Sequence, residues 1–171
     1  AIDSRDFTNQ RWPFVQELPE QPRQTTFTVI RLAPGPFMVS LVPEGSQTPA
    51  GYPGYGGQFG SYLPLLEGIR DILSFVDTQD YNCPPIQGLY GEYYMPGSVD
   101  YHAAATELFL RGFDVGRNPK HHFDALPPDT IIIGYLNSDT TPQIVVESMR
   151  MLVTGQSSLP KSLVLRVLLL S

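Results

Sequence analysis

The feature that most constrains this chain is a repeated alternation between short, uninterrupted apolar runs and segments in which apolar residues recur at helical spacing. The apolar runs predict four strands, over residues 37–42, 73–79, 131–136 and 162–170. Helical spacing predicts helices over residues 25–33, 63–73, 98–113 and 141–153. Uninterrupted apolar runs are typical of strands buried on both faces, and parallel strands need a crossover, which a helix supplies. The pattern therefore predicts an α/β fold in which parallel strands alternate with helices.

Two of the predicted helices begin with recognisable capping residues. Ser98 can cap the helix that follows it, and Asp100 lies in the first turn, where the helix dipole favours a negative charge. Thr141 is followed by Pro142, which gives a capping residue and then proline at the first helical position. The segments 45–60 and 82–97 are predicted to be loops, the first because it is rich in Gly, Tyr and Pro.

Length and composition limit the domain organisation. The chain has 171 residues, whereas a complete eightfold α/β barrel usually needs about 250. Hydrophobic residues make up 42% of the chain, which is enough for a core, and 17 prolines with 15 glycines indicate many loops. Residues 1–24 lack a sustained period and are predicted to form an extended N-terminal arm, followed by one domain over residues 25–171.

Charge and residue counts argue against several kinds of function. The 11 basic and 17 acidic residues give a net charge of −6 without a basic cluster, so no nucleic-acid partner is expected. The chain has neither an apolar run long enough to span a membrane nor the features of a signal peptide at its start. Cys83 is the single cysteine and is predicted to be a structural thiol. The three histidines lack ligand spacing, so neither a metal nor another cofactor is expected.

The residues at the ends of the predicted strands are less generic. The first strand ends in Leu41–Val42–Pro43–Glu44, the second in Thr78–Gln79–Asp80–Tyr81–Asn82, and the third contains Ile133–Gly134–Tyr135–Leu136. Gly60–Ser61–Tyr62–Leu63–Pro64 and Gly97–Ser98–Val99–Asp100–Tyr101–His102 lie between them. In this order and spacing the chain resembles the C-terminal half of a family-18 glycoside hydrolase of the bacterial and fungal chitinase type. The resemblance covers roughly residues 25–155 and implies strands five to eight of a (β/α)8 barrel, so that residues 25–171 form a half-barrel-like domain.

The chain departs from this family at the residues that carry the acid. The family's Asp-x-x-Asp-x-Asp-x-Glu motif, whose Glu protonates the glycosidic oxygen, is absent. Asp77 and Asp80 supply its first spacing, but Asn82 and Pro84 stand where further carboxylates would be needed. The last predicted strand also lacks the family's tryptophan. The resemblance thus implies a chitinase-type hydrolase, an endo-β-N-acetylglucosaminidase, while leaving the enzymatic activity of this chain open.

The resemblance also implies roles for individual residues. Tyr81 is expected to hydrogen-bond the acetamido group of the substrate, with Asn82 as the adjacent polar residue, and these two are the candidate catalytic positions. The candidate substrate-binding residues are Glu44, Gln79, Tyr52, Tyr55 and Tyr135. For Tyr81 and Gln79, the alternative is a buried strand residue with a satisfied hydrogen bond. For the loop that carries Tyr52 and Tyr55, the alternative is a flexible surface loop.

Three functional hypotheses stay open at this point. The first is a chitinase-like protein that acts on β-1,4-linked N-acetylglucosamine polymers once missing strands are supplied. The second is a catalytically silent protein that binds chitin oligosaccharides, and the third is an unrelated flavodoxin-like domain. Because half a barrel leaves unpaired strand edges, we expect a homo-oligomer or a complex with a complementary half-barrel. The resemblance further implies a secreted protein.

Overall fold

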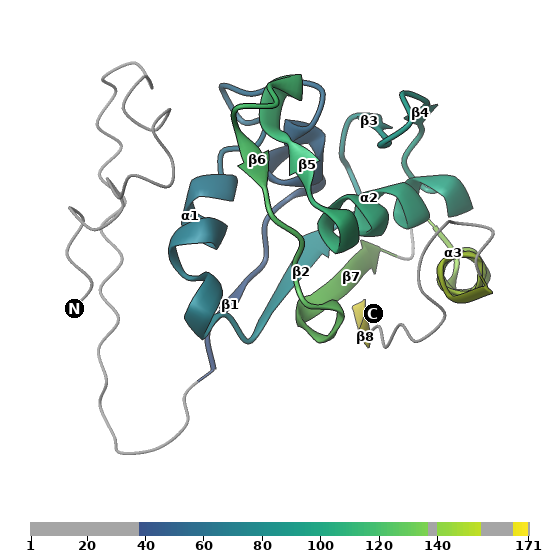
Figure 1. Ribbon diagram of the computed structural model, residues 1–171. Coiled ribbons are helices and arrows are strands. Elements are labelled where there is room, and N and C mark those ends of the chain that lie inside the picture. Colours follow the sequence, from purple (N-terminus) through teal and green to yellow (C-terminus); the bar gives the residue numbers. More distant parts are fainter. Residues whose placement is uncertain (1–37, 137–139, 155–165, 171) are drawn as a thin grey trace.

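The fold is built on a parallel sheet of four strands, described here from a computed structural model that covers residues 38–136, 140–154 and 166–170. The predicted N-terminal arm and the helix predicted over residues 25–33 lie outside these residues. The strands are β1 (Ser40–Leu41), β2 (Phe75–Gln79), β7 (Ile131–Leu136) and β8 (Arg166–Leu170). They pair in the order β1-β2-β7-β8, and every pair is parallel (Figure 1). The predicted α/β class with parallel strands is confirmed.

The strand order also separates two of the hypotheses. Among the described strands, spatial neighbours follow one another along the chain. A flavodoxin-like sheet has a reversal in its strand order, at which the ligand binds. No such reversal occurs in this sheet, so the flavodoxin-like hypothesis is wrong, and the order is that of consecutive barrel strands.

Three helices accompany the sheet: α1 (Leu63–Gly68), α2 (Val99–Arg111) and α3 (Pro142–Thr154). Both predicted caps are present, since the backbone N–H of Tyr101 donates to Ser98 Oγ at 3.2 Å and that of Ile144 donates to Thr141 Oγ1 at 3.3 Å. Short 3-10 turns cover Gly45–Gln47, Pro49–Gly51, Arg70–Ile72, Val115–Arg117 and Pro128–Thr130. The helix predicted over residues 63–73 is therefore a short α-helix followed by one of these turns.

Two small antiparallel hairpins occur where sequence patterns predicted none. The pair β3 (Ile86–Gln87) and β4 (Tyr93–Tyr94) lies inside the segment 82–97 that was expected to be a loop. The pair β5 (Phe113–Asp114) and β6 (His122–Phe123) begins where α2 stops. The helix ends at Arg111 and not at residue 113, because Gly112 takes a φ of 74°, which carries the chain out of the helix.

The two faces of the sheet have different surroundings. Side chains alternate along a strand, so Val76, Thr78 and Asp80 share one side of β2. Thr78 and Asp80 lie against Ala105 and Phe109 of α2, and Figure 1 shows α2 crossing in front of β2 and β7. We call this side the helix face. The opposite side, called the inner face below, carries Asp77 and Gln79.

The main core fills the space between the helix face, the helices and the β5–β6 hairpin. Three phenylalanines lie at its centre: Phe109, Phe113 and Phe123 are each at most 2% exposed and form edge or tilted ring pairs. The Arg70 guanidinium lies 4.9 Å from the centre of the Phe123 ring and donates to the carbonyl oxygens of Asp124 and Ala125. The hairpin is thereby fixed to the end of α1. Among the described helices, none has the length and apolar character needed to cross a bilayer.

Gly134 offers a direct test of how closely β2 and β7 approach. A Cβ atom at this position would lie 2.6 Å from Asp77 Oδ1 and 3.0 Å from the Thr78 carbonyl oxygen. We expect Gly134→Ala to lower the free energy of unfolding by about 1–3 kcal/mol, because the added methyl group overpacks this contact. Gly54→Ala is the matched control, since a Cβ atom added there would have no other atom within 4 Å. Urea unfolding in which the two variants behave alike would contradict the described packing.

Candidate functional site

The candidate site lies at the carboxyl ends of β1 and β2. The register between these strands is constant: it pairs Ser40 with Phe75 and, beyond the end of β1, Glu44 with Gln79. This register places Val42 opposite Asp77 on the inner face. Glu44, Gln79 and Asp77 are thus brought together on one side of the sheet, as the resemblance led us to expect for the first two.

Gln79 is held by the neighbouring strand end. Its backbone N–H donates to the Pro43 carbonyl at 2.9 Å, and its Nε2 donates to the Val42 carbonyl at 2.9 Å. The side chain is half-buried, so part of its surface faces solvent. The amide is fixed in orientation before any ligand arrives.

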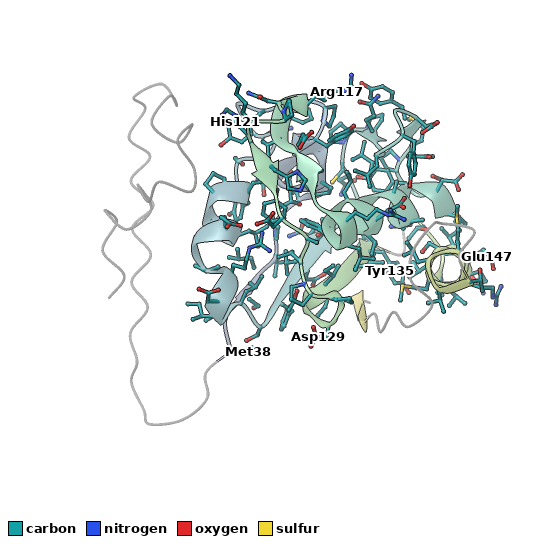
Figure 2. The ribbon with its side chains drawn as sticks, in the orientation of Figure 1. Met38, Arg117, His121, Asp129, Tyr135 and Glu147 are labelled. Carbon is teal, nitrogen blue, oxygen red and sulfur yellow. The ribbon has the colours of Figure 1, made fainter. Side chains whose placement is uncertain are left out.

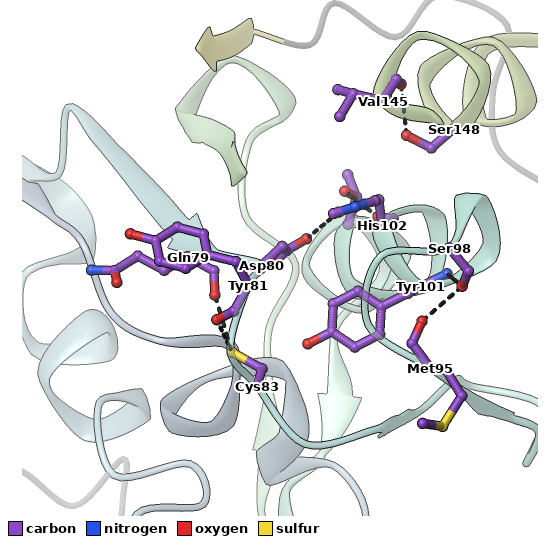
Figure 3. A network of polar contacts seen from close by, with 11 residues as sticks. Gln79, Asp80, Tyr81, Cys83, Met95, Ser98, Tyr101, His102, Val145 and Ser148 are labelled. Atoms are coloured by element: carbon purple, nitrogen blue, oxygen red, sulfur yellow. Dashed lines mark hydrogen bonds and ion pairs between the residues drawn. The ribbon is translucent and has the colours of Figure 1, made fainter. Parts of the chain in front are cut away.

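Tyr81 follows Gln79 on the same side, and Figure 3 shows the two side chains extending together away from α2. Burial is the main cause that raises the pKa of Tyr81, with smaller contributions from the charges of Asp77, Cys83 and Glu44. The phenol therefore keeps its proton at neutral pH and is available as a hydrogen-bond donor. Its half-buried ring also presents an apolar wall.

The turn after Tyr81 is tied down by two further residues. Asn82 has a φ of 52°, in the left-handed region that asparagine tolerates better than most residues. Its exposed position in the turn gives it a role in chain reversal beside Tyr81. The Cys83 thiol is the donor to the carbonyl oxygens of Gln79 and Tyr81, each 3.1 Å from Sγ, which agrees with a structural thiol.

Glu44 is exposed, and its carboxylate caps a turn of the same chain. Its carboxylate accepts from Ser46 Oγ at 3.3 Å, and it forms a reciprocal capping pair with Gln47 at the start of the turn Gly45–Gln47. Its position at the site is therefore as expected, while its carboxylate is engaged in capping. Any contact with a ligand would use the remaining exposed surface of this side chain.

The three tyrosines predicted to bind substrate do not join this group. Tyr135 is 2% exposed and is labelled in Figure 2. It follows Gly134, which pairs with Gln79, so the alternation of β7 puts Tyr135 on the helix face, on the other side of the sheet from Gln79. Tyr55 packs against Gly60 and Gly116, and burial raises its pKa to about 12. Tyr52 lies beside Phe113, in a groove on the helix side of the molecule.

Asp77 is a site residue that the sequence analysis did not select. It is 2% exposed on the inner face, and its Oδ1 accepts no hydrogen bond from the described residues. Burial, and secondarily the charge of Asp80, raises the pKa of this carboxyl. Its position two residues before Gln79 in a strand was the signal that could have found it.

A buried pair stabilises the same turn from the other side of the sheet. Asp80 Oδ2 lies 3.2 Å from His102 Nδ1, and both side chains are almost completely buried between β2 and α2. Figure 3 shows Asp80 reaching toward His102 while its neighbours Gln79 and Tyr81 point the other way. The Asp80 backbone N–H also donates to the Gly134 carbonyl at 2.8 Å. The turn that carries Tyr81 is thus anchored to α2 and to β7.

These residues can orient a ligand, but neither of their carboxyl groups is free to act as an acid: the exposed Glu44 carboxylate is engaged in capping, and Asp77 is buried. Tyr81 can donate a hydrogen bond to a carbonyl group, and the fixed amide of Gln79 adds a second polar contact. Asp77 holds a proton more readily than an exposed aspartate, but its carboxyl is buried. Among the described residues, no group of three or more His, Cys, Asp or Glu side chains is arranged to hold a metal ion.

The raised pKa of the Asp80 carboxyl predicts how the free energy of unfolding depends on pH. Burial raises its pKa, and the hydrogen bond and charge of His102 offset this only in part. An aspartate whose pKa is raised on folding stabilises the fold fully below its unfolded pKa, and this contribution is lost as pH rises through the folded pKa. The side chain of the Asp80→Asn variant cannot ionise, so the variant does not lose this contribution. We therefore expect the free energy of unfolding of the variant, minus that of the original chain, to increase as pH rises from 4 to 7.

Urea unfolding at several pH values measures this difference, with the exposed Asp129→Asn as the control. Parallel pH profiles for the Asp80→Asn variant and the original chain would contradict the account of the buried pair.

The relatives found by sequence comparison are named as chitinases. Chitinase Chi52 of Paenibacillus xylanexedens is 35% identical over 128 residues, which cover 71% of this chain and 24% of that protein. Exochitinase 1 of Streptomyces olivaceoviridis is 34% identical over 140 residues, which cover 77% of this chain and 23% of that protein. The chain therefore spans about a quarter of the length of these curated relatives. No protein-family model matches it.

A solved structure supports the same assignment. A family GH18 chitinase from Chromobacterium violaceum superposes with a TM-score of 0.67 at 25% identity, covering 79% of this chain and 40% of that one. The four parallel strands and the residues at their ends match what a chain that spans only part of a barrel would contain. The resemblance inferred from sequence is confirmed: this is a family-18 chitinase-like chain, carrying part of that family's barrel.

Proposed function

We propose that this chain binds β-1,4-linked N-acetylglucosamine oligomers on the inner face, at the carboxyl ends of β1 and β2. The observation that carries the proposal is the convergence of Gln79, Tyr81 and Glu44 on one side of the sheet. A phenol donor beside a fixed amide suits an acetamido group, which offers a carbonyl acceptor and an N–H donor. The names of the relatives, all chitinases, support the choice of ligand.

We propose further that the chain by itself binds these sugars without cleaving them. Protonation of the leaving oxygen needs a carboxylic acid within reach of the bond, and general acid catalysis contributes roughly 10²- to 10⁴-fold in rate. Of the two carboxyl groups that the strand register places on the inner face, that of Asp77 is buried and that of Glu44 is engaged in capping. Hydrolysis would require an acid from residues that another chain or segment brings to this face. A secreted location belongs to the same proposal and is supported by the family resemblance.

Calorimetric titration with triacetylchitotriose tests the binding site. We expect Tyr81→Phe to weaken binding roughly two- to tenfold, because it removes one hydrogen bond worth about 0.5–1.5 kcal/mol and keeps the ring. Tyr62→Phe, another half-buried tyrosine, is the control and should bind as the original chain does. A fluorogenic chitobioside assay run beside it should give no turnover.

Two results would count against the proposal. Equal affinity of the Tyr81→Phe variant and the original chain would remove Tyr81 from the site. Turnover by the chain alone would show that one of its own carboxyl groups acts as the acid, and the binding-only proposal would then be wrong.

We also propose that a second copy of the chain pairs along the β1 edge of the sheet. On the edge strand and the residues beside it, Met38 is 70% exposed and Val42 is 48% exposed. Apolar side chains at a strand edge favour association, since the edge also offers unpaired backbone groups. A complementary half-barrel from a different chain is the alternative partner for the same edge.

Light scattering after size-exclusion chromatography measures the association. We expect the mass of at least two chains of 19.0 kDa each. Val42→Glu should shift it to the mass of one chain, because it puts a charge at the paired edge. Val146→Glu is the control, because Val146 is 56% exposed on α3, away from this edge. A clean monomer for the original chain would contradict the proposal of a second copy.

A further inference from the structure

A groove of about 380 Å³ lies outside the strand-end site, between the loop after β1 and the two hairpins. Its walls include Tyr52, Gln87, Tyr90, Asp114 and Arg117. This volume falls within the range of small-molecule sites, roughly 300–1,000 Å³. Its residues come from three segments that are far apart in sequence, so the fold itself assembles the groove.

The groove lies on the helix side of the sheet, away from Gln79 and Tyr81. The β5–β6 hairpin packs in one core with Phe109 of α2 and lies above the sheet in Figure 1, and Figure 2 labels Arg117 at the top of this hairpin. Gln79 and Tyr81 extend from the opposite side of β2.

The aromatic wall of the groove is held in position. The Tyr52 ring packs edge-on against Phe113 with ring centres 6.2 Å apart, and its hydroxyl donates to the Leu89 carbonyl at 3.4 Å. The Arg117 backbone N–H donates to the Tyr52 carbonyl at 2.9 Å, and its guanidinium lies 5.9 Å from the Tyr52 ring centre. Fixed aromatic rings are suited to stacking against an apolar face of a ligand.

The polar wall offers both donors and acceptors. Asp114 Oδ1 is 2.8 Å from His122 Nδ1, which orients its carboxylate. Gln87 is 4% exposed, and its Nε2 donates to the Gly91 carbonyl at 2.5 Å while its Oε1 has no partner among the described residues. A nearly buried amide with an unused acceptor is uncommon in folded proteins and indicates a missing partner.

The charges of the groove select a class of ligand. One carboxylate and one guanidinium balance each other, so neither a strongly anionic nor a strongly cationic ligand is favoured. Exposed aromatic surface continues from the groove along its hairpin, where Tyr90 and Tyr93 are each 65% exposed. Balanced polar groups beside aromatic rings suit a neutral ligand that has hydroxyl groups on its edges and C–H groups on its faces, which describes a pyranose.

We propose that this groove is a second carbohydrate site, which binds one or two pyranose units of a neutral oligosaccharide independently of the strand-end site. The inference shares its ligand class with the proposed function but depends on different residues. An oligosaccharide that is long enough would engage the chain at two places, and the groove would raise its affinity for polymer over short oligomers.

An NMR titration of the full chain with diacetylchitobiose tests this inference, because it reports each site separately. We expect saturable shifts at the backbone amides of Gly91, Asp114 and Arg117 that persist in Tyr81→Phe. Tyr90→Ala and Asp114→Asn should each weaken the binding measured at these amides by roughly two- to tenfold. Both substitutions fall on solvent-accessible side chains, and Arg150→Gln on α3 is the control.

The outcomes separate the two proposals. Unchanged groove amides up to about 10 mM ligand, with shifts at the strand-end residues, would overturn the groove inference and leave the proposed function standing. Shifts at the groove amides alone would support the groove and count against the strand-end site. Equal binding by the groove variants and the original chain would overturn the assignment of these side chains.

Discussion

The parallel pairing of β2 with β7 is the constraint on which the rest of the structure depends. It sets Gln79 opposite Gly134 and Asp77 opposite Ile132, so a residue without a side chain lies where the Asp77 carboxyl needs space. The same register fixes which side chains of β2 face α2 and which face away. A slip of one residue would exchange the two faces and put Gln79 into the core.

Contacts on both faces of the sheet hold the residues of the site in place. On the helix face, the buried contact between Asp80 and His102 joins the end of β2 to α2. On the inner face, the Gln79 amide is tied to the Val42 carbonyl of the edge strand. Tyr81 stands between these anchors, and the Cys83 thiol contacts the carbonyl oxygens on either side. Such a site is rigid before binding, which lowers the entropy that a ligand must lose at the protein.

Much of this architecture could be predicted from local sequence patterns. The parallel strands and both helix caps follow from apolar runs and capping residues, which act within a few positions along the chain. The hairpin at residues 86–94 could not be predicted, because strands of two residues are too short to have a period. Asp77 could have been found by counting two residues back from Gln79. The orientation of Tyr135 depends on the register between β2 and β7, which no single segment encodes.

The Asp80–His102 contact joins residues 22 positions apart and depends on where α2 settles on the sheet, so strand-end motifs alone could not predict it. A crystal structure of the chain grown with triacetylchitotriose would show whether the inner face at the ends of β1 and β2 receives an N-acetylglucosamine oligomer. We expect sugar density against Tyr81 and Gln79 on the side away from α2. Density found only elsewhere, with both side chains bare, would contradict this proposal.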